Sequence, residues 1–139
     1  MESAAMVLGI DMMDSDHQRI ENMLATAPQT ADADLPGLHR AVCAELAAHF
    51  AREETLMREN DFPGLHCHVS QHSFILAEMA RDSLTREAAD LRRKLEVAIP
   101  QLIQSHVSTM DRMAAAFLKG DLARSDFDIL RLPLSGALP

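Results

Sequence analysis

Residues 38–57 read LHRAVCAELAAHFAREETLM, and their apolar side chains recur at steps of three and four. This spacing places side chains on one face of an α-helix. Two residues that can bind metal, His49 and Glu53, fall in the same stripe as the leucines. The stretch therefore predicts an amphipathic helix with polar ligands on its inward face. Its expected inward residues are Leu38, Val42, Leu46, His49, Glu53 and Leu56.

Three other segments share this helical period. Their expected inward residues are Met13, His17, Ile20, Leu24 and Ala27 in the first, Leu65, His68, His72, Ile75 and Met79 in the third, and Leu91, Leu95, Ile99, Leu102, His106, Met113 and Phe117 in the last. Residues 28–37 and 60–64 are expected loops, a turn falls within 81–94, and Gly120 ends the last helix. These elements predict an all-α, up-down-up-down antiparallel four-helix bundle with a short N-terminal segment and a C-terminal extension.

A chain of 139 residues, 47% of them hydrophobic, is the size of one domain. We expect residues 1–120 to form the bundle, and residues 121–139 to form the extension, a short helical piece and then a loose tail. Pro100 falls inside the last stripe, where it removes a backbone hydrogen bond. It either bends that helix or marks its start, and the sequence leaves both possibilities open.

The net charge of −8 argues against some partners. It would repel the phosphates of nucleic acids and anionic membrane surfaces. No apolar run approaches the length needed to cross a bilayer. Cys43 and Cys67 are too few for a disulfide framework and suit a reducing compartment. We therefore expect a cytoplasmic protein that binds neither nucleic acid nor membrane.

Several polar residues occupy positions expected to face the interior. His49 and Glu53 are four residues apart, as are His68 and His72, so each pair projects from one helix face, and His17 lies on another helix. Burying an unpaired carboxylate with several imidazoles costs several kcal/mol unless something compensates it. A metal ion would do so. The alternative is that the helices are rotated differently and these are surface histidines.

His106 fits the last stripe, whereas Asp111 does not. Five residues on an ideal helix turn through about 140° relative to the starting face. Spacing alone would therefore leave Asp111 in solvent.

In order along the chain, His17, H-x-x-x-E at 49–53, H-x-x-x-H at 68–72 and H-x-x-x-x-D at 106–111 resemble the signature of the hemerythrin family. The stretches GIDMMDSDH, ending at His17, and HFAREE, beginning at His49, also resemble bacterial hemerythrins. The resemblance covers about residues 8–118.

The resemblance implies a cofactor of two iron ions with a bridging oxo or hydroxo group. One iron would be bound by His68, His72 and His106, the other by His17 and His49, and both by Glu53 and Asp111. The second iron would then have one open position, where dioxygen binds. Apolar side chains near the ligands would form the oxygen pocket, although each also suits ordinary core packing: Ile20, Phe50, Ile103 and Val107.

Other polar residues near these motifs receive no ligand role. His39 and His66 match no ligand position, and both are expected to be exposed. Glu54 is expected to point outward, because neighbours on a helix lie about 100° apart.

The resemblance to hemerythrins implies a protein that binds dioxygen reversibly as a carrier, store or sensor in a bacterial cytoplasm, rather than an enzyme. One alternative is a di-iron enzyme that acts on peroxide or nitric oxide. Another is an iron or redox sensor, in which the extension would contact an unidentified protein partner.

Overall fold

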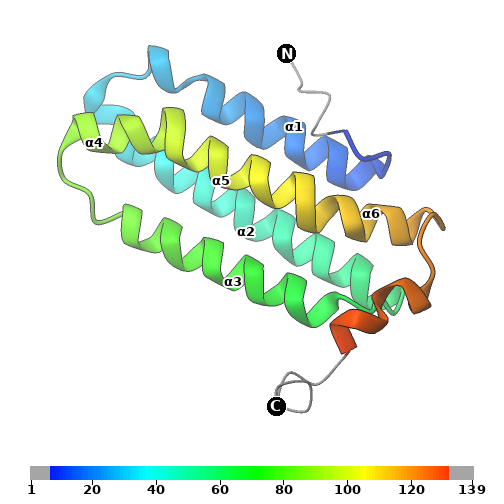
Figure 1. Cartoon of the computed structure of the whole chain (residues 1–139). Coiled ribbons are helices and arrows are strands. Elements are labelled where there is room, and N and C mark those ends of the chain that lie inside the picture. The colour runs from blue at the N-terminus through cyan, green and yellow to red at the C-terminus, as the bar shows by residue number, and fades with distance from the viewer. Residues whose placement is uncertain (1–6, 132–139) are drawn as a thin grey trace, which may run out of the picture.

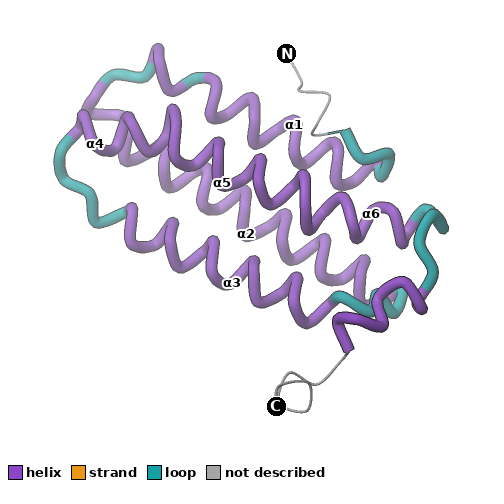
Figure 2. The backbone as a smooth tube through the Cα atoms, viewed as in Figure 1, coloured by secondary structure: helices purple, strands orange, loops and turns teal. Residues whose placement is uncertain are grey.

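In the computed structural model, which describes residues 7–131, four long helices pack antiparallel (Figure 1). No strand occurs within those residues, and the connections lie at the two ends of the bundle (Figure 2). This confirms the predicted all-α four-helix bundle. The first three helices are α1 (Asp11–Ala25), α2 (Leu35–Glu59) and α3 (Leu65–Asp82). The fourth is α4 (Ala88–Arg93), the π-helical turn η4 (Lys94–Ala98), α5 (Ile99–His106), the π-helical turn η5 (Val107–Asp111) and α6 (Arg112–Leu118).

The connection between α1 and α2 is more ordered than the predicted loop at 28–37. It contains two short 3-10 turns, Ala27–Gln29 and Asp32–Asp34, and α2 already begins at Leu35. Pro36 lies in the first turn of α2, where its missing N–H would have had no partner in the helix. Leu35 is fully buried. It therefore begins the inward face of α2.

The inward face of α2 differs at both ends from the predicted stripe. Leu38 and Leu56 are only half-buried, whereas His39 and Met57 are buried. The expectation that His39 is exposed was wrong, because the face that begins at Leu35 returns to the core at residue 39. Burial lowers the pKa of His39, so it is a neutral core side chain.

Pro100 does not begin the last helix, which runs on through it. Just before Pro100, the N–H of Ile99 bonds to the carbonyl of Lys94, five residues back. Proline cannot form the regular bond four residues back, and its ring crowds that carbonyl. The distortion at Pro100 therefore takes the form of the π-helical turn η4.

Gly120 ends the last helix, as predicted. Its φ is +84°, a left-handed conformation that glycine adopts without steric cost. The N–H of Gly120 bonds to the carbonyl of Phe117 at 3.0 Å, and that of Asp121 to the carbonyl of Ala116 at 2.8 Å. This is the Schellman pattern of helix termination.

Part of the predicted C-terminal extension packs on the bundle. The segment η6 (Arg124–Arg131) is a 3-10 helix, and its Phe127 is buried. Phe127 belongs to a small apolar cluster with Met57, Phe62 and Ala114. The predicted loose tail falls mostly on residues 132–139, which lie outside the described part of the chain.

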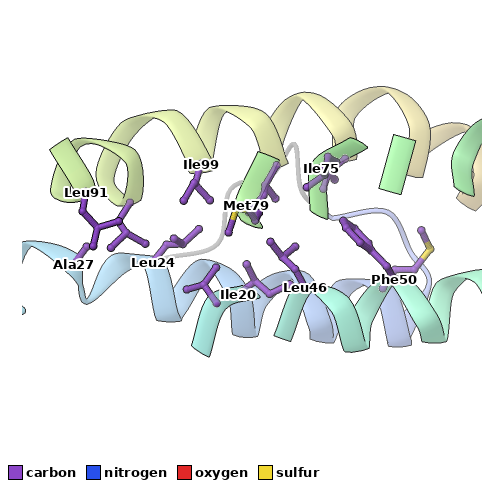
Figure 3. Close-up of a cluster of buried hydrophobic side chains, with 14 of the residues drawn as sticks. Ile20, Leu24, Ala27, Leu46, Phe50, Ile75, Met79, Leu91 and Ile99 are labelled. Carbon is purple, nitrogen blue, oxygen red and sulfur yellow. The ribbon is translucent and has the colours of Figure 1, made fainter. Parts of the chain in front are cut away.

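The main hydrophobic core lies between all four helices. Ile20 and Leu24 from α1 meet Leu46 from α2, Ile75 from α3 and Ile99 from α5 (Figure 3). Across residues 7–131, no helix is both long and apolar enough to span a membrane.

We predict that Leu35→Ala destabilises the fold by about 2–5 kcal/mol, because truncating a fully buried leucine leaves a cavity. Urea denaturation measures the change in unfolding free energy. The control is Leu84→Ala, since Leu84 is 76% exposed; it should change stability by less than about 0.5 kcal/mol. Equal effects of the two substitutions would contradict the assignment of Leu35 to the core.

Candidate metal centre

The structure brings all seven predicted ligand residues together in the interior of the bundle. Their ligand atoms form two overlapping groups, within each of which every atom lies within 4.8 Å of the others. One group is Glu53, His68, His72, His106 and Asp111, and the other is His17, His49, Glu53 and Asp111. All seven side chains are buried. The alternative reading, surface histidines on rotated helices, was therefore wrong.

The π-helical turn η5 explains how Asp111 joins His106. A π turn pairs backbone groups five residues apart, so residues i and i+5 come to one face. The result is a distance of 3.0 Å between His106 Nε2 and Asp111 Oδ1. Beyond η5 the inward face is shifted, so Met113, predicted inward, is 42% exposed, while Ala114 and Ala115 are buried.

Glu53 divides its two oxygens between two sets of histidines. Its Oε1 lies 2.8 Å from His68 Nε2 and 3.0 Å from His72 Nε2. Its Oε2 lies 3.2 Å from His49 Nε2. One carboxylate from α2 therefore faces imidazoles on both sides.

Asp111 divides its oxygens in the same way. Its Oδ1 lies 2.8 Å from His68 Nε2 and 3.0 Å from His106 Nε2, and its Oδ2 lies 3.0 Å from His17 Nε2. The two carboxylates thus separate a three-histidine set, His68, His72 and His106, from a two-histidine set, His17 and His49. This arrangement suits two cations that share both carboxylates.

Three of the clustered atoms are buried without a hydrogen-bond partner within the described residues: His49 Nε2, Glu53 Oε2 and His106 Nε2. Buried polar atoms normally have a partner, and exceptions need an explanation. Imidazole nitrogens and carboxylate oxygens are common ligands of transition metals. The cluster therefore fits metal ions, which would use these free lone pairs.

The electrostatics keep the carboxylates ionised. Burial and the nearby Asp111 would raise the pKa of Glu53, but the facing imidazoles of His49, His68 and His72 lower it to about 2. The pKa of Asp111 is also well below its ordinary value, because the facing imidazoles of His106, His17 and His68 outweigh burial. Both residues thus offer negative charge to a cation at neutral pH.

The protons on the histidines respond to this charge. Burial opposes the charged form of His68, but hydrogen bonds to Asp111 and Glu53 raise its pKa to about 9. Without a metal, His68 therefore carries a proton that helps to balance the buried carboxylates.

Two acidic residues outside the cluster orient its histidines. Asp16 is buried and accepts a hydrogen bond from His49 Nδ1 at 2.9 Å, while Arg52 Nε donates to the same oxygen at 2.9 Å. Burial would raise the pKa of Asp16, but its bonds with Arg52, His49 and Arg19 lower it to about 2. A carboxylate on the far nitrogen of a ligating histidine fixes the ring orientation and increases its basicity.

Glu54 contacts the Nδ1 atom of His72, just as Asp16 contacts that of His49. Its Oε2 accepts from His72 Nδ1 at 2.8 Å, and its side chain is only 24% exposed. The expectation that Glu54 points simply outward was therefore wrong. Sequence reasoning missed both orienting acids; their only signal was an acidic residue next to a ligand, Asp16 before His17 and Glu54 after Glu53.

The four predicted pocket residues also meet at one place. Ile20, Phe50, Ile103 and Val107 line a small cavity of about 10 Å³, which is close to the minimum for one water-sized molecule. The ring of Phe50 also stacks on His72, with centroids 3.8 Å apart. The cavity touches His17, His49, His106 and Asp111, and its other lining residues are Leu46 and Ile75. It therefore lies beside the two-histidine set.

The remaining metal-binding side chains lie elsewhere. His66 is exposed, as predicted, and so is Cys67. His39 lies 3.7 Å from Cys43, measured from Nδ1 to Sγ, and belongs to neither ligand group.

Comparison with known proteins agrees with this geometry. Residues 8–120 match the family described as the hemerythrin HHE cation binding domain. A bacteriohemerythrin of Ralstonia nicotianae is 35% identical over 130 residues, which are 89% of this chain and 93% of that protein. No solved structure gives a significant match.

We predict that Asp16→Asn weakens metal binding about 10- to 100-fold, because an amide holds His49 less firmly than a carboxylate does. Competition with a chelator of known affinity measures this change. Glu45→Gln is the matched control, since Glu45 accepts from Arg19 in the same network but does not contact His49. Equal affinities for Asp16→Asn and Glu45→Gln would refute an orienting role for Asp16.

Metal uptake should also displace the proton of His68. Because its pKa is raised from 6.5 to about 9, this proton stabilises the metal-free fold fully below about pH 6.5, and that stabilisation is lost as the pH rises through about 9. The apparent metal affinity should therefore increase from pH 6 to pH 9, with protons released at neutral pH. Calorimetric titration in two buffers of different ionisation enthalpy measures the release. His66→Ala should leave it unchanged, and a heat independent of buffer would count against this competition.

Proposed function

This chain belongs to the hemerythrin family, and on that premise we propose that it binds dioxygen reversibly at a centre of two iron ions. The observation that carries the proposal is the way Glu53 and Asp111 each divide their oxygens between a three-histidine and a two-histidine set. A carboxylate that bridges two metal ions must present one oxygen to each ion, and both side chains are placed to do so.

The proposed ligands follow from the two groups. His68, His72 and His106 hold one iron, His17 and His49 hold the other, and Glu53 and Asp111 bridge them. With a shared oxo or hydroxo group, the first iron would have three histidines and the second only two beside the same carboxylates, so the second would keep a position open for dioxygen. The small cavity touches both histidines of the second set but only one of the first, His106. The location of this cavity supports an open coordination position on the iron held by His17 and His49.

When bound, the ferrous ions supply the electrons and the coordination position that dioxygen needs. The protein's own contribution is a dry, close-fitting surrounding. Ile20, Ile103 and Val107 are buried beside the two-histidine set, and Phe50 closes the side towards His72. Excluding water and anions from this space would slow oxidation of the irons.

The enzyme alternative is less well supported. Turnover of peroxide or nitric oxide needs a proton donor beside the substrate. The carboxyl group that lines the cavity, Asp111, has a pKa well below its ordinary value. Asp111 is therefore a poor donor of protons at neutral pH.

Carriage or storage in a bacterial cytoplasm is the proposed role. The free thiols Cys43 and Cys67 suit a reducing compartment, and the relative described above comes from a bacterium. A sensor that signals through residues 121–139 is the alternative. This segment is in contact with the bundle, because its Phe127 packs with Met57, Phe62 and Ala114.

The decisive experiment is anaerobic loading with iron(II), followed by the visible absorption spectrum on adding dioxygen and again after purging. Two irons per chain and a coloured band that appears and disappears over repeated cycles are expected. His106→Ala should lower iron content, since it removes a ligand from the three-histidine set. Immediate irreversible oxidation would contradict reversible binding, and unchanged iron content in His106→Ala would contradict the ligand assignment.

A further inference from the structure

An apolar groove of about 410 Å³ runs along the bundle between α1 and the last helix. Figure 1 shows α1 beside the segment that carries α4 and α5. The walls of the groove are mostly aliphatic. Its lining residues from the first segment are Ile20, Glu21, Leu24, Ala25 and Pro28, and those from the last helix are Leu95, Glu96, Pro100, Ile103 and Gln104.

The inner end of the groove meets the cavity beside the metal centre. Ile20 and Ile103 line both spaces, and both side chains are buried. Three other hollows, at Cys43, Thr55 and Thr85, share no lining residue with that cavity. Two isoleucine side chains are therefore shared between the groove and the cavity.

The backbone explains why the groove is present here. Ala25 at the end of α1 and Pro28 in the 3-10 turn that follows have short side chains and are exposed. Opposite them, Pro100 lines the groove just after the π-helical turn η4, which interrupts the regular α-helical hydrogen bonds. Small residues on one wall and a distorted helix on the other leave the surface unfilled.

The chemistry of the groove suits a small uncharged molecule. Its walls are apolar, and the ionisable residues that line it are both acidic, Glu21 and Glu96. Glu96 is paired with Arg92, with Nη1 and Oε2 3.2 Å apart. Carboxylates at this position repel anions but do not affect a neutral diatomic molecule.

We propose that dioxygen reaches the metal centre through this groove, with the side chains of Ile20 and Ile103 as its gate. The inference rests on the dioxygen binding proposed above. Side chains in a packed interior still change rotamers, so two buried isoleucines can open the passage without any movement of the helices.

Gln104→Trp and Ala25→Phe test the route by filling the groove from outside. Both residues are exposed, and neither lines the cavity. In the iron-loaded full chain, stopped-flow measurements should show association and dissociation rates of dioxygen that both fall, by about tenfold. Their ratio should stay constant, because a blocked route raises a barrier and changes neither end state.

Ala80→Phe is the matched control, since Ala80 is exposed on α3 and lines a different hollow. It should leave both rates unchanged. A groove variant that alters the affinity alone, or rates that remain unchanged in Gln104→Trp and Ala25→Phe, would overturn the proposal.

Xenon gives a readout that does not depend on dioxygen binding, because it occupies apolar cavities. Crystals of the iron-loaded full chain under xenon pressure should show density in the groove and beside Ile20 and Ile103, and Gln104→Trp should remove the groove density. If dioxygen oxidises the irons irreversibly, the proposed function fails, while xenon in the groove and slower oxidation in Gln104→Trp would still support the route. Xenon found only in other hollows would overturn it.

Discussion

The burial of two ionised carboxylates among five imidazoles is the constraint on which this structure depends. Glu53 and Asp111 are fully buried, and an unpaired carboxylate in such a place costs several kcal/mol. The protein meets this cost by placing an imidazole nitrogen 2.8–3.2 Å from each carboxylate oxygen. The remaining free lone pairs lie inside the cluster, where bound cations would use them. All four helices of the bundle contribute to the cluster, because no single helix face could supply seven such groups.

Two π-helical turns in the last helix perform different tasks. The turn η5 brings Asp111 to the face that carries His106, and without it the carboxylate of Asp111 would point away from the cluster. The turn η4 accommodates Pro100 and lies along the apolar groove. In both cases a break in regular hydrogen bonding changes which side chains face the interior. Such turns occur frequently at functional sites.

The acids around the cluster connect it to the surface of the protein. Asp16 joins His49 to the partly exposed Arg52, and Glu54 joins His72 to solvent. On the other side, Ile20 and Ile103 separate the centre from the groove. Orientation of the histidines and access to the proposed open position therefore depend on different side chains, so each can be altered separately.

The sequence by itself determined the four helices, the inward stripes and the grouping of His17, His49, Glu53, His68 and His72, because helical periodicity is a local property of the chain. It could not place Asp111 from spacing, and only the resemblance to hemerythrins included it. The tertiary structure decided the rest: the π turn at Asp111, the burial of His39, and the bonds from Asp16 and Glu54 to the histidines. The physical reason is that burial and side-chain partners depend on which helix packs opposite. A change of one residue in the hydrogen-bonding pattern, as in η5, then turns every later side chain by about 100°.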